Sequence, residues 1–251
     1  MNHPSVLIVI PARGGSKGLP RKNAKQLGDL PLLAWTAEAI KRANLTNCTA
    51  LLSTDDEEIA RIGKAAGLSV PFFRPNELAQ DTSSVVDVVL HALSWQSHWQ
   101  APPDAIMLLQ PTSPFRSPET IREALSLFYE KQVDAVIGVK SIFRSLQTIF
   151  YADSLGKLSA INNESEKLST HRQEVEPLLT PNGAMYLVKT HVLQQQKTFF
   201  PASIYGLQMD GISSHDIDTP DDWLVAETLY SAQKTWRHDL NLLDTVSVKN
   251  F

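Results

Sequence analysis

Positive charges and glycines gather directly after the first apolar run of the sequence. Residues 11–25 read PARGGSKGLPRKNAK. They include five cations, Arg13, Lys17, Arg21, Lys22 and Lys25, and three glycines, Gly14, Gly15 and Gly18. Glycines let backbone amides approach an anion closely, and successive amides can form a nest for phosphate oxygens. Because five cations exceed the need of one phosphate, the segment is interpreted as a loop that binds a triphosphate.

The glycine spacing matches neither of two common nucleotide-binding motifs. The Walker A pattern GxxxxGK[ST] is absent, and the loop reads GGxxG where a dinucleotide fingerprint reads GxGxxG. A solvated basic turn is the alternative to a binding loop. The position directly after a buried strand favours binding, since ligands on open parallel sheets lie beyond the carboxyl ends of the strands.

Alternating apolar strands and amphipathic helices must position this loop. The first apolar run, VLIVI at residues 6–10, is typical of a strand covered on both faces. Further strands are expected at residues 49–53, 70–73, 104–110, 134–139 and 184–188. Helices are expected at residues 31–42 and 54–66, from Ser83 or Ser84 through Trp95, from Ser117, and from Thr219 with Pro220 in the first helical position. This order predicts an α/β, Rossmann-like, mostly parallel sheet flanked by helices.

The alternation stops between residues 140 and 177. Short polar segments at residues 145–151 and 156–161 indicate hairpins there and not further crossovers. We therefore expect one α/β domain over residues 1–239, with residues 140–177 as an inserted lobe or subunit-contact arm. Residues 240–251 are expected to form a loose C-terminal tail.

Composition excludes several classes of protein. The chain has 251 residues, 43% of them hydrophobic and 20% charged, which is ordinary for a soluble domain with a sizeable core. A net charge of −4 leaves no basic field for a nucleic-acid backbone. The single cysteine, Cys48, excludes an internal disulfide. No apolar run reaches the ~20 residues of a membrane span, and no signal peptide is evident, so a cytoplasmic protein is expected.

Six collinear blocks resemble one family of nucleotide enzymes. The first is IPARGGSKGLPRKN at residues 10–23, and the others are STD at 53–55, RPNELAQDT at 74–82, LLQPTSP at 108–114, PNGAMY at 181–186 and DID at 216–218. Together they resemble the N-acylneuraminate cytidylyltransferases, or CMP-sialic acid synthetases, with their legionaminate and pseudaminate relatives. One block would be a weak signal, but the ordered set spans nearly the whole chain.

The resemblance implies the reaction and the CTP contacts. That family joins a nine-carbon 2-keto-3-deoxy sugar acid to CMP, using CTP and Mg²⁺ and releasing pyrophosphate. By resemblance, Arg13, Ser16 and Lys17 hold the triphosphate, with Lys22 nearby. Asn23, Arg74 and the stretch from Asp81 to Ser84 would contact the cytidine. The residues expected to be most important for catalysis are Arg13, Lys17 and Asp218.

The metal is expected at Asp216 and Asp218. Residues two apart on an extended segment share a face, so both carboxylates can reach one ion. Mg²⁺ prefers such oxygen ligands and fills its remaining positions with water and phosphate oxygens. The alternative is that these acids cap the helix that starts at Pro220, which suits Asp218, whereas Asp216 comes too early in the sequence.

The sugar acid is expected to meet Gln110, Arg172 and Asn182, with Arg172 on its carboxylate. A strand-end amide that bonds its own loop and a free surface arginine are the alternatives for Gln110 and Arg172. Thr180 stands where N-acetylneuraminate enzymes often carry an arginine, and Gln147 where they carry a lysine. These departures point toward a related acid such as legionaminate or pseudaminate. The family also implies a homodimer that uses the 140–177 arm.

Two other functions compete with this one. A synthetase for Kdo, the eight-carbon analogue, usually reads Ser-Arg-Leu-Pro-Gly-Lys where this chain reads SKGLPRKN at residues 16–23. A non-catalytic nucleotide-binding module would not need the acid pair together with the cationic loop. Pyrophosphate release from CTP with a panel of sugar acids separates all three.

Overall fold

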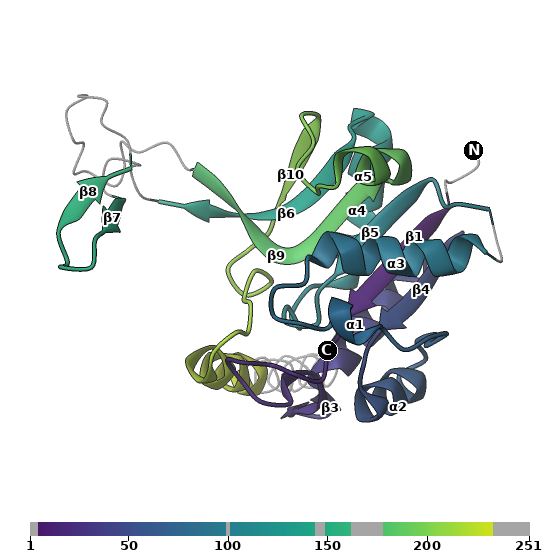
Figure 1. The fold of residues 1–251 in the computed structure, drawn as a ribbon, viewed down its shortest axis with the longest axis horizontal. Helices are drawn as coiled ribbons and strands as arrows, with labels where there is room; N and C mark the ends of the chain where they lie inside the picture. Colours follow the sequence, from purple (N-terminus) through teal and green to yellow (C-terminus); the bar gives the residue numbers. More distant parts are fainter. Residues whose placement is uncertain (1–4, 99–100, 144–148, 162–177, 233–251) are drawn as a thin grey trace, which may run out of the picture.

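A six-stranded sheet carries the cationic loop at the end of its strand β1 (Figure 1). The computed structural model describes residues 5–98, 101–143, 149–161 and 178–232. The strands are β1 Val6–Pro11, β4 Cys48–Ser53, β5 Ala105–Leu109, β6 Ala135–Ile142, β9 Leu178–Lys189 and β10 Ile204–Gln208, in the order β10-β6-β9-β5-β1-β4. β4 and β5 run parallel to β1, and β10 runs parallel to β6. β9 is antiparallel to both neighbours. The mostly parallel α/β sheet is confirmed.

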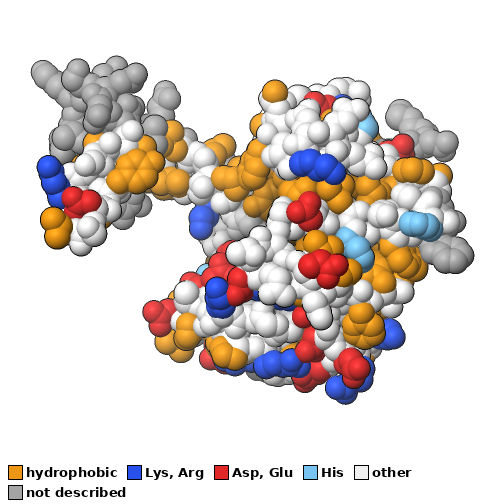
Figure 2. Space-filling view, in the orientation of Figure 1, with side chains coloured by type: hydrophobic (Ala, Val, Ile, Leu, Met, Phe, Trp, Pro, Cys, Tyr) orange, Lys and Arg blue, Asp and Glu red, His pale blue; other side chains and the backbone are white. Residues whose placement is uncertain are grey.

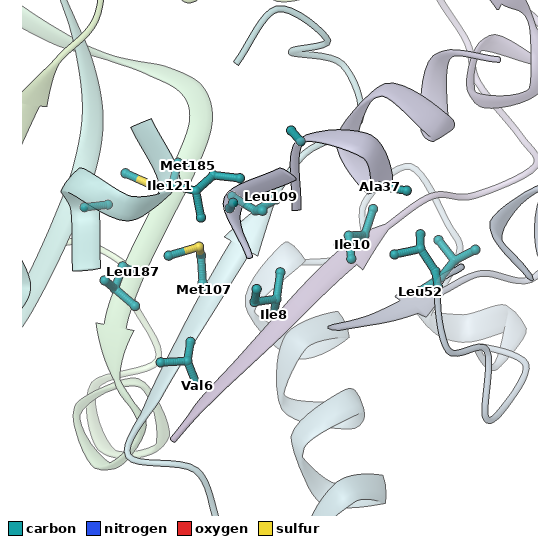
Figure 3. Close-up of a cluster of buried hydrophobic side chains, with 14 of the residues drawn as sticks. Val6, Ile8, Ile10, Ala37, Leu52, Met107, Leu109, Ile121, Met185 and Leu187 are labelled. Atoms are coloured by element: carbon teal, nitrogen blue, oxygen red, sulfur yellow. The ribbon is translucent and has the colours of Figure 1, made fainter. Parts of the chain in front are cut away.

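Helices cover both faces of this sheet, which explains the wholly apolar β1. The helices are α1 Leu32–Ala43, α2 Glu57–Ala65, α3 Val85–Ser97, α4 Pro118–Lys131, α5 Thr190–Gln196, and a last helix at residues 220–232. Ile8 and Ile10 face the core beneath α1, α2 and α4, beside Met107 (Figure 3). Leu7 and Val9 face the opposite core, which includes residues of α3 and α5. Every residue of the strand from Val6 to Ile10 is therefore buried.

A third, smaller core lies under the cationic loop. Its buried members are Leu19, Leu27, Leu32, Ile217, Trp223 and Ala226. They come from the loop, the start of α1, the segment before the last helix and that helix itself. Two short strands, β2 Gln26–Leu27 and β3 Leu30–Pro31, form a hairpin there. This core joins the beginning of the chain to residues 217–226 and thereby fixes the loop beside the acid pair.

The strand expected at residues 70–73 is wrong. Only two isolated parallel bridges occur there, Leu51 with Ser69 and Thr54 with Phe73. Pro71 lies between them and has no amide hydrogen, so it cannot donate to a ladder. β10 and the antiparallel direction of β9, by contrast, were not anticipated.

The arm projects from one end of the sheet on the extended ends of β6 and β9 (Figure 1). Within it, β7 Phe150–Ala152 pairs antiparallel with β8 Leu158–Ala160, in agreement with the expected hairpin. Figure 2 shows hydrophobic side chains on the surface of the arm. In this hairpin, the side chains of Tyr151, Leu155 and Leu158 are 67%, 93% and 60% exposed. The 162–177 segment of the arm, with Arg172, lies outside the described residues, as do Gln147 and the tail at residues 240–251.

Candidate active site

Glycines let the cationic loop pack tightly against acidic neighbours. The Gly14 amide donates to Asp55 Oδ1 at 3.0 Å, and a Cβ at Gly14 would lie 2.7 Å from Asp56 Oδ2. A Cβ at Gly18 would clash with the backbone carbonyl of Asp218. The loop and the acid pair, about 200 residues apart in sequence, are therefore in direct contact in the fold.

Three of the five loop cations face the acids of the candidate site. Arg13 and Lys17 both bind Asp81, at 2.6 and 2.8 Å, and Lys22 binds Asp218 at 2.9 Å. The Lys22 ammonium also donates to the carbonyl of Ile217, and its side chain is only 9% exposed.

The other two cations, Arg21 and Lys25, are used elsewhere. Arg21 turns to Asp56 and Glu58 at the start of α2, and Lys25 lies 4.1 Å over the Trp223 ring. Of the five loop cations, the three that face the site acids are the three that the family resemblance assigns to the triphosphate.

The residues expected around CTP fall into two groups. Asn23 is buried and donates to the carbonyl of Arg13 at 3.1 Å. Ser16 is half-buried and lies between Arg13 and Lys17 in the loop. Ser84 is exposed, and its hydroxyl accepts from the Val86 amide as the N-cap of α3. The side chains of the first group hold or line the loop, whereas the Ser84 hydroxyl has a structural use already.

Asp81 and Arg74 differ in how their charges are balanced. Hydrogen bonds from Lys17 and Arg13 hold the pKa of Asp81 below its ordinary value. Arg74 is buried, its nearest carboxylate is Asp55 at 3.8 Å, and its Nε and Nη2 have no hydrogen-bond partner among the described residues. Burial lowers the pKa of Arg74. A buried guanidinium with unused donors is suited to a ligand that supplies acceptors.

The acid pair flanks a buried isoleucine. The Ile217 amide donates to the Thr112 carbonyl at 2.9 Å, which fixes the segment. The helix at residues 220–232 is capped by Thr219 and Asp222, whose side chains and amides bond reciprocally at 2.8 and 3.2 Å. Asp218 is therefore not needed as a cap, and the capping alternative for this residue is wrong.

Asp216 has the environment of a cation ligand. Burial raises its pKa, and the nearby Asp218 charge adds to that effect. The nearby Thr112 hydroxyl partly offsets the effect of burial on this pKa. Oδ1 of Asp216 is buried and has no hydrogen bond of ordinary geometry among the described residues, and a Cβ at Gly183 would lie 3.3 Å from its Oδ2. The described residues contain no group of three or more His, Cys, Asp or Glu side chains spaced for a metal. The two carboxylates, Asp216 and Asp218, nevertheless fit Mg²⁺, which takes its other ligands from water and phosphate.

Two of the residues expected at the sugar, Gln110 and Asn182, lie near the end of β5 and in β9, and Arg172 is outside the described residues. Gln110 is half-buried directly after β5. Asn182 is only 4% exposed; its amide donates to Ser214 Oγ at 2.9 Å, and its Oδ1 accepts from the Ala184 amide at 3.1 Å. The Asn182 side chain thus already has internal partners, and its expected contact with the sugar stays a prediction.

Sequence reasoning missed Arg116. This residue is buried and donates to the backbone carbonyls of Gln110, directly after β5, and of Ala184 in β9. It follows the block at residues 108–114 and resembles an ordinary turn residue before a helix. No local signal could have identified it, because two of its partners, Thr36 and Ala184, lie 80 and 68 residues away.

Comparison with known proteins decides the family. A family model described as cytidylyltransferase matches residues 7–235. The chain belongs to the cytidylyltransferase family. It is 36% identical to a CMP-N,N'-diacetyllegionaminic acid synthase of Legionella pneumophila over 89% of this chain and 95% of that one.

Other relatives of the cytidylyltransferase differ in length. An N-acylneuraminate cytidylyltransferase of Escherichia coli is 34% identical over 94% of this chain, which spans 54% of that protein's length. A post-translational flagellin modification protein B of Campylobacter coli is 30% identical over 89% of this chain and 94% of that one.

Solved structures confirm the fold of the cytidylyltransferase. A CMP:2-keto-3-deoxy-manno-octonic acid synthetase in complex with CTP matches with a TM-score of 0.66 and 17% identity, over 91% of this chain and 99% of that one. A 4-diphosphocytidyl-2C-methyl-D-erythritol synthase of Anaerococcus prevotii matches with a TM-score of 0.59 and 13% identity, over 92% and 100%. Within the described ranges, none of the helices combines the length and apolarity of a bilayer-spanning segment.

Proposed function

We propose that this cytidylyltransferase activates a nine-carbon 2-keto-3-deoxy sugar acid with CTP, giving the CMP-sugar and pyrophosphate. N,N'-diacetyllegionaminic acid is the first candidate substrate. The Legionella pneumophila relative is named for the CMP derivative of this acid, and it is similar to this chain over 95% of its length. The observation that carries the proposal is the contact between the cationic loop and the acid pair, made by Gly18 and Lys22 against Asp218. A triphosphate at this junction meets both groups.

The loop provides charge neutralisation for the triphosphate. Arg13, Lys17 and Lys22 lie where they can exchange their carboxylate partners for phosphate oxygens. The anomeric hydroxyl oxygen of the sugar then attacks the α-phosphorus in line. Its new bond to phosphorus forms as the bond to the bridging oxygen of the β-phosphate breaks, the hydroxyl proton passes to solvent water, and pyrophosphate leaves with the electron pair. The contribution of the protein is alignment and electrostatic stabilisation.

Mg²⁺ would be held by Asp216 and Asp218, with phosphate oxygens and water completing its coordination. When bound, it would stabilise charge on the phosphate oxygens and lower the pKa of a coordinated hydroxyl. Asp216 Oδ1, which is buried and has no hydrogen bond of ordinary geometry to any residue that the structure describes, supports this assignment. Lys22 neutralises Asp218 in its absence and remains near the ion site.

The sugar half would use Gln110 and Arg172 as contacts, Arg172 on the carboxylate. We propose that Asn182 acts differently from the expectation, because its amide is committed to Ser214 and Ala184. It holds the turn at Gly183 in place beside Asp216. Thr180 is half-buried in β9 at the position where N-acetylneuraminate enzymes often have an arginine, which favours a legionaminate-type acid.

We propose a homodimer that uses the arm. The arm exposes several large apolar side chains, those of Phe143, Phe150, Tyr151, Leu155 and Leu158. Apolar patches of this kind usually mark a protein–protein contact. Light scattering is expected to give twice the 27.8 kDa chain mass. A monomer at micromolar concentration would contradict it. A cytoplasmic location, with its supply of CTP, is part of the same proposal.

A substrate panel tests the proposed function. The enzyme is incubated with CTP, Mg²⁺ and, in turn, N,N'-diacetyllegionaminic, pseudaminic, N-acetylneuraminic and Kdo acids, and both pyrophosphate and the CMP-sugar mass are measured. We expect the highest kcat/KM with a legionaminate-type acid. Preference for Kdo would favour the rival synthetase, and CTP binding without turnover of any acid would favour a binding module.

A further inference from the structure

Strand β9 is paired with neither of its neighbours at residues 182–184. On one side, its ladder with β5 ends at the pair Leu109 and Met185. On the other, it pairs Tyr186 with Ile137 of β6 and then Pro181 with Val139, so residues 182–185 stand opposite the single residue Gly138. This is a large bulge, and bulges beside active sites commonly re-aim a segment of strand.

The bulge is tightly packed and touches the acid pair. Gly183 has φ +78°, and a Cβ there would lie 3.3 Å from Asp216 Oδ2. A Cβ at Gly138 would lie 2.6 Å from Asn182 Oδ1, so β6 has no room for a larger side chain at this position opposite the bulge. The conformation of the bulge therefore sets the wall against which Asp216 lies.

Arg116 takes the place of the missing rung between β5 and β9. Gln110 and Ala184 would form the next pair after Leu109 and Met185, and Arg116 Nη1 donates to the backbone carbonyls of both, at 3.4 Å for Gln110. Its Nη2 donates to Thr36 Oγ1 of α1 at 3.0 Å. One side chain thus links the strand end that carries Gln110, the bulge and α1.

This link is costly for the fold. Arg116 is 3% exposed, and the three acceptors it reaches are neutral oxygens. Its Nε has no acceptor among the described residues, and burial lowers its pKa. Burying a charge without a counter-ion is unfavourable, and an apolar side chain of similar volume would avoid the cost. A purely structural filler would not need a guanidinium.

We propose that Arg116 is a positioning residue that fixes the spacing between Gln110 and the β9 bulge, and so sets the sugar-acid half of the site. The inference rests on the proposed function for its substrate. Arg116 acts through the backbone of Gln110 and Ala184. The cationic loop is not among the groups to which Arg116 is hydrogen-bonded, so CTP binding is expected to be independent of it.

Two variants and a matched control test this role. Arg116→Lys keeps the charge but cannot reach three acceptors, and Thr36→Val removes only the Nη2 acceptor. Arg122→Met is the control, because Arg122 lies on α4, the helix that follows Arg116, and also donates to two carbonyls, those of Arg42 and Ala43 at 3.2 and 3.3 Å, while its side chain is 44% exposed. We expect KM for the sugar acid to rise about tenfold in Arg116→Lys and about threefold in Thr36→Val, with the Kd of CTP within about twofold of wild type. The control should change neither.

Hydrogen exchange gives a readout that needs no sugar substrate. In Arg116→Lys we expect faster amide exchange confined to residues 109–114 and 182–186. Exchange that rises evenly over the whole chain, exchange unchanged in these two segments, or a KM for the sugar acid equal to that of wild type would overturn the proposal. If the wild-type enzyme turns over no acid in the panel, the proposed function fails, and exchange alone decides the role of Arg116.

Discussion

The exposed cations of the loop half, Arg13 and Lys17, and the polar groups of the β9 half are held in opposite ways, although Lys22 of the loop is buried. In the loop half, Lys17 is 78% exposed, and Arg13 and Lys17 share one exposed carboxylate, Asp81. In the β9 half, Arg116 and Asn182 are 3% and 4% exposed and are hydrogen-bonded to backbone and neutral side chains. Exposed ion pairs are weak and screened by salt, whereas buried hydrogen bonds fix a geometry.

This difference matches the chemistry of the two substrates. A triphosphate brings several negative charges of its own and can displace Asp81 from cations that are already gathered. A sugar acid has one charge and many hydroxyls, so its recognition depends on preset positions. We therefore expect substitutions in the loop half to alter charge-dependent steps and those in the β9 half to alter geometry-dependent ones.

Removing a carboxylate of the proposed metal site should have the largest effect. In Asp218→Ala, kcat should fall by about a thousandfold, because the ion and Lys22 lose a shared ligand. The fold should survive, since the Asp218 side chain is 71% exposed. Asp221→Ala, an exposed acid three residues further on, is the control and should keep near-wild-type activity. Steady-state kinetics and a thermal melt measure both effects, and unfolding of Asp218→Ala would indicate a structural role.

Adding a methyl group at the bulge should have the next largest effect. Gly183→Ala places a side chain at φ +78° and a Cβ against Asp216, so we expect kcat/KM for the sugar acid to fall about tenfold and stability to fall by about 1 kcal/mol. Gly156→Ala in the arm has φ +81° and open space around the new methyl. It should show the stability loss alone. Equal activity losses in both variants would show that Asp216 is not involved.

Neutralising Asp81, the carboxylate that pairs with Arg13 and Lys17, should have a smaller effect and should strengthen CTP binding. Asp81→Asn frees Arg13 and Lys17 from their internal partner, so we expect KM for CTP to fall about threefold at low salt and the difference to fade as salt rises. Glu58→Gln, which loosens Arg21 outside the site, should leave KM for CTP unchanged. A rise in KM for CTP in Asp81→Asn would show that this carboxylate organises the cations and does not compete for them.

The smallest expected effect concerns stability and pH. Burial raises the pKa of Asp216 above its unfolded value, so its charged form destabilises the fold, and this cost appears as pH rises through the interval between the two pKa values. Asp216→Asn should therefore raise Tm by about 2–4 °C at pH 7 without Mg²⁺. The gain should vanish at a pH below both values. A lower Tm for the variant than for the wild type at pH 7 would contradict the prediction that the charged Asp216 side chain destabilises the fold.

The sequence predicted the elements whose signals are local. The apolar run of β1, the glycine loop that follows and the acids at 216 and 218 each show their character within a few residues. Residues 70–73 failed as a strand because one proline outweighed their β-branched and aromatic neighbours. The direction of β9, its bulge and the role of Arg116 depend on partners far away in sequence, such as Leu109, Gly138 and Ala184. Such features are set by tertiary pairing, which a single sequence does not encode locally.

The central claim is that cytidylyl transfer takes place where the loop meets Asp218. The most direct test is the initial rate of pyrophosphate release from CTP with N,N'-diacetyllegionaminic acid, measured for the wild-type enzyme beside Lys17→Ala and Asp218→Asn. We predict steady release by the wild type, dependent on Mg²⁺, and near-complete loss in both folded variants. Release by either variant at the wild-type rate, or none by the wild type with any sugar acid, would contradict the claim.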